Sequence, residues 1–460
     1  MAGRYSDYTK YKDSGVKWLG EIPAHWCCTQ IKYGYEVTLG KMLQKDQKVS
    51  TDKLRLYLKA VNVQPGGVSL IDVKKMWFSE SDLHSLRLKD GDVLISEGGD
   101  VGRAAIWRSE LEECYIQNAL NRARAQKNNS SRFLYYWMNI LKDSSYIEVI
   151  CNKATIAHYT AEKVETSPLV LPPEDEQEAI ANFLDYETVK IDTLIDKQQQ
   201  LIKLLKEKRQ AVISHAVTKG LNPDAPMKDS GVEWLGEVPE HWDIRAVSKL
   251  SNKITNGYVG PTRDILVEEG VSYVQATHIK KGKVNFDGAY FVRQHWSDEH
   301  SKSILSKGDV LIVQTGAGTG DIGLVSDEEV GFNCHALIIV EPDKELISGD
   351  FLSMVFQSEY GYSKLYSIRT GGMHPHLNCG EVQFVKVPIL PKGEQDQIIN
   401  YIENTITRFD LLVSKQLDAI SLMQERRTAL ISAAVTGKID VRNWKSEKQK
   451  SSFEHRKELL

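Results

Sequence analysis

The sequence predicts an α+β protein with two similar mixed α/β domains, each followed by a long helix, and the two helices pair as an antiparallel coiled coil. Three observations lead to this fold class. The chain repeats itself once, each copy mixes strand-like and helical runs, and each copy ends in an apolar heptad pattern. Each copy therefore has the size of a domain plus a connector.

The repeat is plainest in a lead-in segment. KDSGVKWLGEIPAHW at residues 12–26 returns as KDSGVEWLGEVPEHW at residues 228–242, with 12 of 15 residues identical. Later segments recur in the same order, including KDGDVLI and SKGDVLI, and the entries LPPEDEQ at 171–177 and LPKGEQ at 390–395. A period this long excludes a solenoid, whose repeats are about 20–50 residues long.

The expected organisation has five segments. Residues 1–170 and 223–388 form the two mixed regions, residues 171–222 and 389–441 form the helical regions, and residues 442–460 form a polar, exposed tail. Within the mixed regions, VLI after Gly91-Asp92 and VLIV after Gly308-Asp309 are typical of buried strands. The segments that start at Phe133 and Asp350 have helical apolar faces.

A heptad pattern predicts the long helices. The predicted seam comprises Ile191, Leu194, Leu201, Leu205 and Val212 in the first copy, and Phe409, Leu412, Ala419, Met423 and Leu430 in the second. Polar residues interrupt both seams at matching places, with Gln198 and Lys208 answered by Gln416 and Arg426. As a helix, residues 190–219 would be about 45 Å long. The shared interruptions favour one antiparallel pair over two independent amphipathic helices.

Bulk composition limits the classes of function. Among 460 residues, 41% are hydrophobic, and no run is long enough for a membrane helix or an N-terminal signal, so we expect a cytoplasmic protein without a membrane partner. Six cysteines without CxxC pairs argue against a metal site. The net charge is −4, but residues 1–170 carry +4 and residues 226–390 carry −7. The copies have therefore diverged in charge.

Catalytic motifs are missing from the sequence. A formal G-x-G-x-x-G at residues 318–323 follows a strand-like run, but β-branched residues and not a helix come after it. The shared GD[VI]G is better interpreted as a turn between paired strands. There is no GxxxxGK[ST], HExxH or GxSxG, nor the Asn/Asp-Pro-Pro-aromatic loop of a methyltransferase. We therefore expect no catalytic residue, no metal and no cofactor in this chain.

Divergent polar segments are the candidates for sequence recognition, because readers of different sequences should differ where they read. Arg and Lys suit guanine, Asn and Gln suit adenine, and Thr contacts a thymine methyl or a phosphate. The candidates in the first copy are Gln117, Asn118, Asn121, Arg122, Arg124, Asn152, Lys153, Thr155 and His158. Those in the second copy are Asn256, Tyr258, Arg263, Gln275, Thr277, His278, Arg369, Thr370, Gly371, His374 and His376. The repeated lead-in tryptophans are better interpreted as clamps on the core than as recognition elements.

The layout resembles the specificity subunits of Type I restriction-modification enzymes, the HsdS family. The resemblance spans nearly the whole chain and is carried by the duplicated KDSGVxWLGExPxHW, the GDVLI strands, the LPPxxEQ and LPxxEQ entries, and the helices that end in ISHAVTKG and ISAAVTGK. It implies that each mixed region is a target recognition domain that reads one half of a bipartite site in double-stranded DNA. The helices would then act as a spacer.

The resemblance also implies partners. The helices would dock two methylation subunits that carry S-adenosylmethionine, and a restriction motor-nuclease subunit would use ATP and magnesium, so the chain alone would be inactive. The charge difference between the copies predicts an asymmetric site. Two alternatives stay open: a coiled-coil scaffold that holds two protein-binding domains apart, and an enzyme with an unrecognised site.

Overall fold

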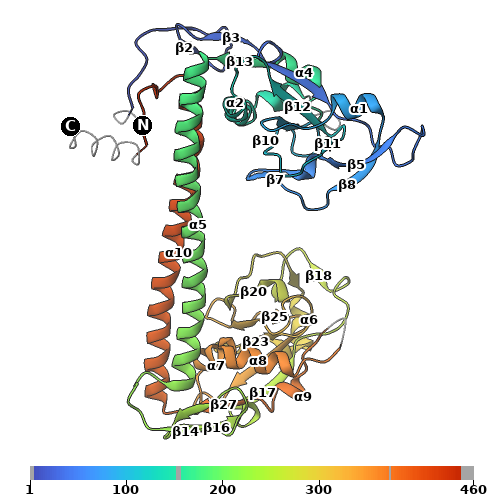
Figure 1. The fold of residues 1–460 in the computed structure, drawn as a ribbon. Coiled ribbons are helices and arrows are strands. Elements are labelled where there is room, and N and C mark those ends of the chain that lie inside the picture. Colours follow the sequence, from blue (N-terminus) through green and yellow to red (C-terminus); the bar gives the residue numbers. More distant parts are fainter. Residues whose placement is uncertain (1–4, 152–156, 372–374, 447–460) are drawn as a thin grey trace, which may run out of the picture. The chain divides into compact units, whose positions relative to one another are not determined.

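The chain forms two compact units in the computed structural model, which describes residues 5–151, 157–371 and 375–446. Unit 1 comprises residues 1–197 and 419–460, and unit 2 comprises residues 198–418. Each unit contains a mixed α/β region and one part of each long helix, α5 (Glu174–Lys219) and α10 (Lys392–Val435), which Figure 1 labels. The predicted α+β class is confirmed.

The mixed region of unit 1 is built around a four-stranded antiparallel sheet with the order β10-β9-β12-β4. These strands are β4 (Tyr35–Leu39), β9 (Val93–Ser96), β10 (Ala104–Ile106) and β12 (Leu120–Ala125). The smaller sheets comprise β1 (Tyr11–Asp13), β2 (Glu21–Pro23), β3 (Cys27–Gln30), β5 (Lys53–Leu58), β6 (Val63–Gln64), β7 (Gly67–Val68), β8 (Lys74–Phe78), β11 (Tyr115–Ile116) and β13 (Pro168–Leu171). The helices are α1 (Glu80–Ser85), α2 (Ser131–Asp143), α3 (Tyr146–Ile150) and α4 (Ala161–Thr166).

Unit 2 repeats this plan around the strands β24-β23-β26-β17, which belong to a six-stranded sheet. That sheet comprises β17 (Ser251–Asn256), β20 (Ile279–Lys280), β21 (Gly282–Val284), β23 (Val310–Val313), β24 (Ile322–Leu324) and β26 (Leu337–Pro342). The other strands are β14 (Met227–Asp229), β15 (Glu237–Pro239), β16 (Asp243–Ala246), β18 (Leu266–Val267), β19 (Val271–Val274), β22 (Phe291–Val292), β25 (Asn333–Cys334) and β27 (Lys386–Ile389). The helices are α6 (Gln294–Glu299), α7 (Gly349–Gln357), α8 (Glu359–Ser367) and α9 (Cys379–Val382).

The repeated Glu-Gln of the helix entries is explained by hydrogen bonds to the preceding domain. Gln177 is fully buried, and its Oε1 accepts a hydrogen bond from the backbone N–H of Ser130 at 2.9 Å. In unit 2, Oε1 of Gln395 accepts the equivalent hydrogen bond from the backbone N–H of Ser348 at 3.0 Å. Both serines cap the N-terminus of a helix that packs on the central sheet, α2 in unit 1 and α7 in unit 2. The two glutamines therefore fix the long helices to the mixed regions.

The adjacent glutamates clamp the lead-in segments. Glu176 is buried and accepts hydrogen bonds from His25 Nε2 at 2.7 Å and Trp26 Nε1 at 2.9 Å. Glu394 receives the equivalent bonds from His241 at 2.8 Å and Trp242 at 3.0 Å. Trp26 and Trp242 are fully buried, as expected for clamping residues.

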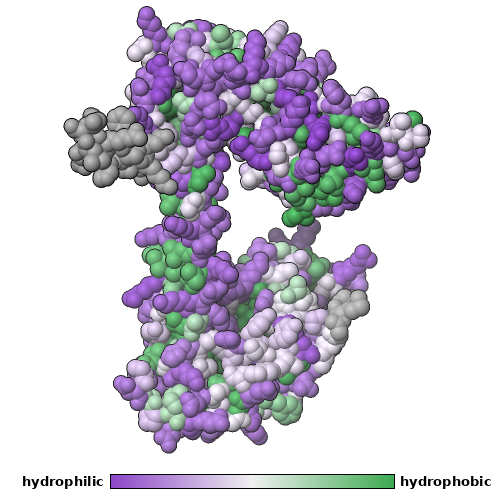
Figure 2. Space-filling view, viewed as in Figure 1, coloured by the Kyte–Doolittle hydropathy of each residue, from purple (hydrophilic) through white to green (hydrophobic). Residues whose placement is uncertain are grey.

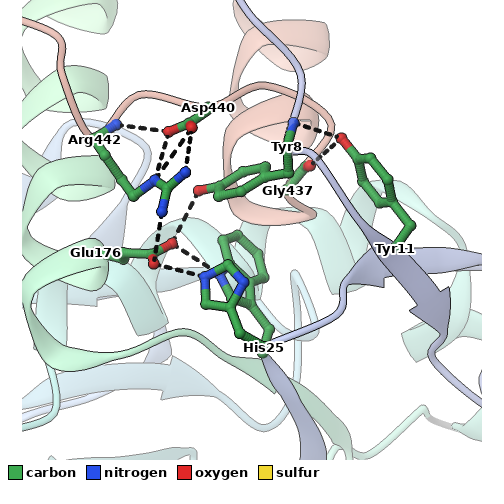
Figure 3. Close-up of polar contacts among 8 residues, drawn as sticks. Tyr8, Tyr11, His25, Glu176, Gly437, Asp440 and Arg442 are labelled. Atoms are coloured by element: carbon green, nitrogen blue, oxygen red, sulfur yellow. Dashed lines mark hydrogen bonds and ion pairs between the residues drawn. The ribbon is translucent and has the colours of Figure 1, made fainter.

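In unit 1 this clamp also holds both ends of the described chain. Figure 3 shows Glu176 among Tyr8, His25 and Arg442, which come from three separate segments. Tyr8 donates to Glu176 at 3.1 Å, and the guanidinium of Arg442 lies 5.0 Å from the Tyr8 ring. Burial, followed by the charge of Glu176, raises the pKa of Tyr8 far above its ordinary value, so its hydroxyl stays a donor.

The start of the predicted polar tail is exposed except at Trp444. Arg442, Asn443 and Lys445 are exposed, whereas Trp444 is half-buried and its ring lies 5.3 Å from Phe183 and 5.3 Å from Tyr186. One large aromatic ring buries enough apolar surface to hold a segment that is polar on average. Residues 447–460 lie outside the described residues.

The long helices lie within the expected helical regions, 171–222 and 389–441, but part of their predicted seam was wrong. α5 begins at Glu174 and α10 begins at Lys392. Ile191 is buried as expected, but Leu194 and Leu201 are each 40% exposed, while Ile195 and Ile202 are only 9% exposed. The predicted heptad period is right, but every second seam position lies one residue later in the sequence than predicted. The apolar face that starts at Ile180 and Leu184 sets this phase, because it must dock against the preceding domain.

The second helix shows the same displacement. Leu412 is 43% exposed, whereas the next residue, Val413, is half-buried. In the same way Ala419 is less buried than Ile420, and Arg426 is exposed whereas Arg427 is half-buried. The remaining predicted seam residues are half-buried or buried: Leu205, Val212, Phe409, Met423 and Leu430. Gln198 and Gln416 are half-buried at the predicted matching places.

An ion pair joins the two helices in each unit. In unit 1, Arg427 Nε lies 2.8 Å from Asp192 Oδ1. In unit 2, Arg209 Nε lies 3.7 Å from Asp410 Oδ1. Both residues of one pair lie 218 positions from their counterparts in the other. The repeat has therefore preserved an interhelical contact as well as the sequence pattern.

Candidate nucleic-acid interface

The central sheet of unit 1 gathers three loops at one edge. β9 pairs with β10 and with β12, and β12 pairs with β4, all antiparallel. Because neighbouring strands alternate in direction, the ends of β4 and β9 meet the starts of β10 and β12. The loops at residues 40–52, 97–103 and 117–119 therefore leave the sheet together. We call this the loop edge of unit 1.

Unit 2 has the corresponding edge. Here β23 pairs with β24 and β26, and β26 pairs with β17, again antiparallel. The loops at residues 257–265, 314–321 and 335–336 form the loop edge of unit 2. The predicted turn between paired strands, around Gly99 and Gly102 and around Gly320 and Gly323, joins β9 to β10 and β23 to β24.

A close backbone approach fixes the first loop in each unit. A Cβ on Gly40 would lie 2.4 Å from the carbonyl oxygen of Gln117, and one on Gly257 would lie 2.6 Å from that of Cys334. Only glycine fits such a contact. As a result Lys41 bridges to Gln117, and Tyr258 bridges to His335.

The two divergent segments predicted to be counterparts reach these same edges. In unit 1 the backbone N–H of Tyr159 donates to the Glu97 carbonyl at 2.9 Å, and in unit 2 Leu377 donates to the Gln314 carbonyl at 2.9 Å. Glu97 and Gln314 occupy equivalent positions after β9 and β23. Each unit therefore brings a fourth loop to its edge.

Three of the candidates in unit 1 belong to the scaffold: Asn121, Arg122 and Arg124. Asn121 is fully buried and donates to the Tyr159 carbonyl at 2.8 Å. Arg122 is 1% exposed and donates to Ser85 O at 2.6 Å and to Thr38 at 2.8 Å. An enclosed and bonded side chain offers no donor to a base edge. Adjacent residues of a strand point to opposite faces, and β12 is buried at residues 120–123, so both Asn121 and Arg122 are enclosed. The composition alone did not reveal it.

Arg124 is held in a two-point ion pair. Its Nε and Nη2 each lie 2.7 Å from an oxygen of the buried Asp92. Asp92 raises the pKa of Arg124 further. The counterparts in unit 2 are Glu341 and Asp309, so an acid replaces the arginine. Burial, with a contribution from Glu341, raises the pKa of Asp309 to about 6.

Three other candidates in unit 1 lie at the loop edge. Gln117 donates to Asn118 at 2.6 Å, and both are partly exposed. His158 is exposed, with Nδ1 3.6 Å from Glu97 Oε1. Asn152, Lys153 and Thr155 lie outside the described residues.

In unit 2 one candidate is internal. His278 is 2% exposed, and its Nε2 lies 3.1 Å from Asp287; burial lowers its pKa. The enclosed His278 offers no donor to a base edge. Asn256 is half-buried, and its Oδ1 accepts a hydrogen bond from Cys379 at 2.9 Å. Gln275 is half-buried, and Tyr258, Arg263 and Thr277 are partly or fully exposed.

The segment that contains Arg369 is tied to the neighbouring glycine-rich loop. Arg369 donates to the carbonyl of Thr319, and its guanidinium lies 4.6 Å from the Tyr366 ring. Thr370 and His376 close the segment through paired backbone hydrogen bonds of 2.9 and 2.8 Å. Thr370, Gly371 and His376 are exposed, whereas His374 lies outside the described residues. Arg369 therefore positions this loop.

Sequence reasoning missed the lysines of the first loop in unit 1. Lys45 and Lys48 are exposed and form no ion pair among the described residues, and Met42 beside them is 75% exposed. Their close spacing, after a strand that ends in glycine, was a signal available in the sequence. In unit 2 the corresponding loop holds Arg263. The first loop thus contributes to the positive balance of the first copy.

A second surface follows the long helices. Leu194 and Leu422 are exposed in unit 1, and their repeat counterparts Leu412 and Leu204 are exposed in unit 2, between 40% and 65%. Figure 2 shows hydrophobic surface along these helices. Each unit therefore presents an exposed pair of leucines at equivalent positions of the repeat.

The described residues include no cluster of three or more His, Cys, Asp or Glu side chains arranged for a metal ion. Among the helices of the described ranges, none combines the length and hydrophobicity of a bilayer span.

Comparison with known proteins connects this geometry to one family. Residues 79–204 match the model of the Type I restriction modification DNA specificity domain. The chain is 24% identical to the Type I restriction enzyme EcoBI specificity subunit of Escherichia coli, over 84% of this chain and 83% of that protein. It is 21% identical to the MjaVIII specificity subunit of Methanocaldococcus jannaschii, over 69% and 73%.

Solved structures share the fold. A chain from a structural study of complex assembly in the type I R-M system matches with a TM-score of 0.69 at 14% identity, over 90% of this chain and 99% of that chain. The HsdS subunit of Thermoanaerobacter tengcongensis matches with a TM-score of 0.53 at 14% identity, over 90% and 98%. The resemblance inferred from the sequence motifs is confirmed.

Proposed function

We propose a division of labour within this chain, a member of the Type I restriction-modification specificity subunits by its DNA specificity domain. Each unit reads one half of an asymmetric, bipartite site in double-stranded DNA through its loop edge. The observation that carries the proposal is the pair of equivalent edges. They share one backbone plan and differ in the side chains they present, as two readers of different sequences require.

The exposed edge residues are the proposed DNA contacts. In unit 1 they are Gln117, Asn118 and His158, with phosphate contacts from Lys45 and Lys48. In unit 2 they are Tyr258, Arg263, Thr277, Thr370, Gly371 and His376. Phosphate contacts position a protein on the duplex, whereas base contacts specify the sequence.

The long helices form an antiparallel coiled coil that sets the gap between the half-sites. The support is the heptad burial in each unit and the repeated ion pairs Asp192–Arg427 and Asp410–Arg209. A pair of rigid helices fixes the distance and the rotational phase between two readers, so the spacing of half-sites follows from helix length.

Methylation subunits dock on the exposed leucines, one beside Leu194 and Leu422 and one beside Leu204 and Leu412. They bring S-adenosylmethionine and the methyl-transfer chemistry, and a restriction subunit brings ATP-dependent, magnesium-dependent cleavage. This chain contributes recognition and no catalytic group. Sharing of phosphate contacts among subunits fits its net charge of −4.

Sequencing of methylated adenines in a host genome tests the proposal. The chain is expressed together with its methylation subunit, and the control expresses the methylation subunit alone. The expected result is a chain-dependent, two-part motif with a fixed unspecified gap. A stable complex that adds no methylation would instead support a scaffold that holds two protein-binding domains.

A further inference from the structure

Two enclosed oxygen atoms lack a hydrogen-bond donor at equivalent places in the two units. They are Oε2 of Glu97 and Oε1 of Gln314, neither of which accepts a hydrogen bond within the described residues. Burying an acceptor without a donor costs about 1–3 kcal/mol. Such atoms are uncommon in folded proteins, and each calls for an explanation. The two atoms recur at equivalent positions 217 residues apart, so chance packing does not explain them adequately.

Both residues lie in the centre of their loop edges on a fixed backbone. Glu97 directly follows β9, and its backbone N–H donates to Ala119 O at 2.9 Å. Gln314 directly follows β23, and its carbonyl accepts from Leu377 at 2.9 Å. A side chain on the end of a buried strand is held more rigidly than one in a free loop. These two positions therefore suit accurate reading of a base.

We infer that Glu97 and Gln314 are specificity-determining residues that each accept a hydrogen bond from the exocyclic amino group of a base. The inference rests on the proposed function. In the major groove only adenine N6 and cytosine N4 present such a group, whereas guanine O6 and thymine O4 are acceptors. A carboxylate accepts but cannot donate, so Glu97 selects adenine or cytosine and disfavours guanine and thymine.

Gln314 has a second capacity. Its amide can accept from adenine N6 through Oε1 and donate to adenine N7 through Nε2, a two-point contact that other bases do not match. Gln314 forms no side-chain hydrogen bond among the described residues, so both ends of the amide are available. Unit 2 therefore reads adenine at this position. An acid in one unit and an amide in the other agree with unlike half-sites.

The surroundings of Glu97 leave one of its two carboxyl oxygens without a partner. Burial raises the pKa of Glu97, and the nearby His158 counteracts this effect. His158 Nδ1 lies 3.6 Å from Oε1, which leaves Oε2 for another donor.

The test exchanges the two side chains. Glu97→Gln and Gln314→Glu are each expressed with the methylation subunit, and methylated motifs are sequenced genome-wide. We expect E97Q to alter the accepted base at one position of one half-site, and Q314E to alter one position of the other half-site. The matched control Glu80→Gln, at an exposed position of α1 in unit 1, keeps the wild-type motif.

A variant that methylates too little for sequencing is examined by DNA binding and thermal melting. Purified complexes are offered duplexes with each base at each specified position. If the variant is folded, discrimination should fall about tenfold or more at a single position. Unchanged motifs, or unchanged discrimination at every position, would overturn the inference. If the wild-type chain itself directs no methylation, the proposed function has failed, which is a distinct outcome.

Discussion

At the scale of single residues, the two units differ most sharply in one buried acid. Asp92 is neutralised by Arg124, whereas its counterpart Asp309 has Glu341 where the arginine would be. Both aspartates also accept a hydrogen bond from the turn before their strand, Asp92 from Lys89 at 2.7 Å and Asp309 from Ser306 at 2.8 Å. The two units therefore share the hydrogen bond from the turn to the aspartate, but only in unit 1 does an arginine neutralise that aspartate.

This difference predicts a pH dependence for unit 2. The pKa of Asp309 is about 6 in the folded chain and about 3.9 when unfolded, so the folded state holds its proton more tightly. The stability it contributes is present below pH 4 and is lost as pH rises through 6. Asp309→Asn should therefore stabilise the chain at pH 8 by on the order of 2 kcal/mol. Urea denaturation at pH 4.5 and pH 8 measures it.

The matched variant Asp92→Asn should act in the opposite direction. It removes the partner of Arg124, so it should destabilise the chain at pH 8 by about 1–3 kcal/mol. Equal effects of the two substitutions, or no gain from Asp309→Asn, would contradict the assigned electrostatics.

The clamp glutamates give a second residue-scale prediction. Glu176→Ala leaves the donors of Trp26, His25 and Tyr8 without an acceptor in a buried place, so it should destabilise the chain by about 2–4 kcal/mol. Glu394→Ala removes two such bonds at a more exposed position and should cost less. Thermal melting ranks the two, and the reverse order would refute the role of Tyr8.

At the scale of elements, the observed helix phase can be tested with adjacent residues. Ile202 is 9% exposed and Leu201 is 40% exposed. Ile202→Ala should cost about 2–4 kcal/mol because it removes buried methyl groups, whereas Leu201→Ala should cost less than about 1 kcal/mol. Denaturant unfolding of the two variants decides the phase. A larger effect at Leu201 would restore the phase predicted from the sequence.

The exposed leucines should control assembly. Leu422→Glu in unit 1 and Leu204→Glu in unit 2 each place a charge on one proposed docking surface, and neither side chain supports the fold. Native mass spectrometry of the complex should show loss of one methylation subunit with each variant and of both with the double variant. Full occupancy in the double variant would exclude these leucines as the docking surface.

Much of the fold could be predicted because it depends on short-range patterns. The repeat, the strands at 93–96 and 310–313 and the heptad period follow from residues close in the sequence. The helix phase could not, because Leu194 and Ile195, or Leu201 and Ile202, are equally apolar and only docking chooses between them. The site was harder still. Arg122 and His278 carry suitable donors, but Arg122 lies on a strand that is buried at residues 120–123 and His278 ends a short 3-10 helix with its side chain enclosed.

At the scale of the whole molecule, each unit contains part of both long helices, so neither mixed region is independent of the pair. The two mixed regions differ in charge, +4 for residues 1–170 against −7 for residues 226–390, and in the residues at their loop edges. In the proposed function, the helix pair is the spacer that combines two short contacts into one specific site.

The gap between the half-sites tests this claim most directly. Deleting one heptad from each helix, residues 198–204 and 415–421, keeps the seam in phase and shortens the pair by about 10 Å. That length corresponds to about three base pairs of DNA. Sequencing of methylated adenines should then return the same two half-sites with a gap about three base pairs shorter, or no methylation if the geometry is not tolerated. An unchanged gap with active methylation would contradict the account.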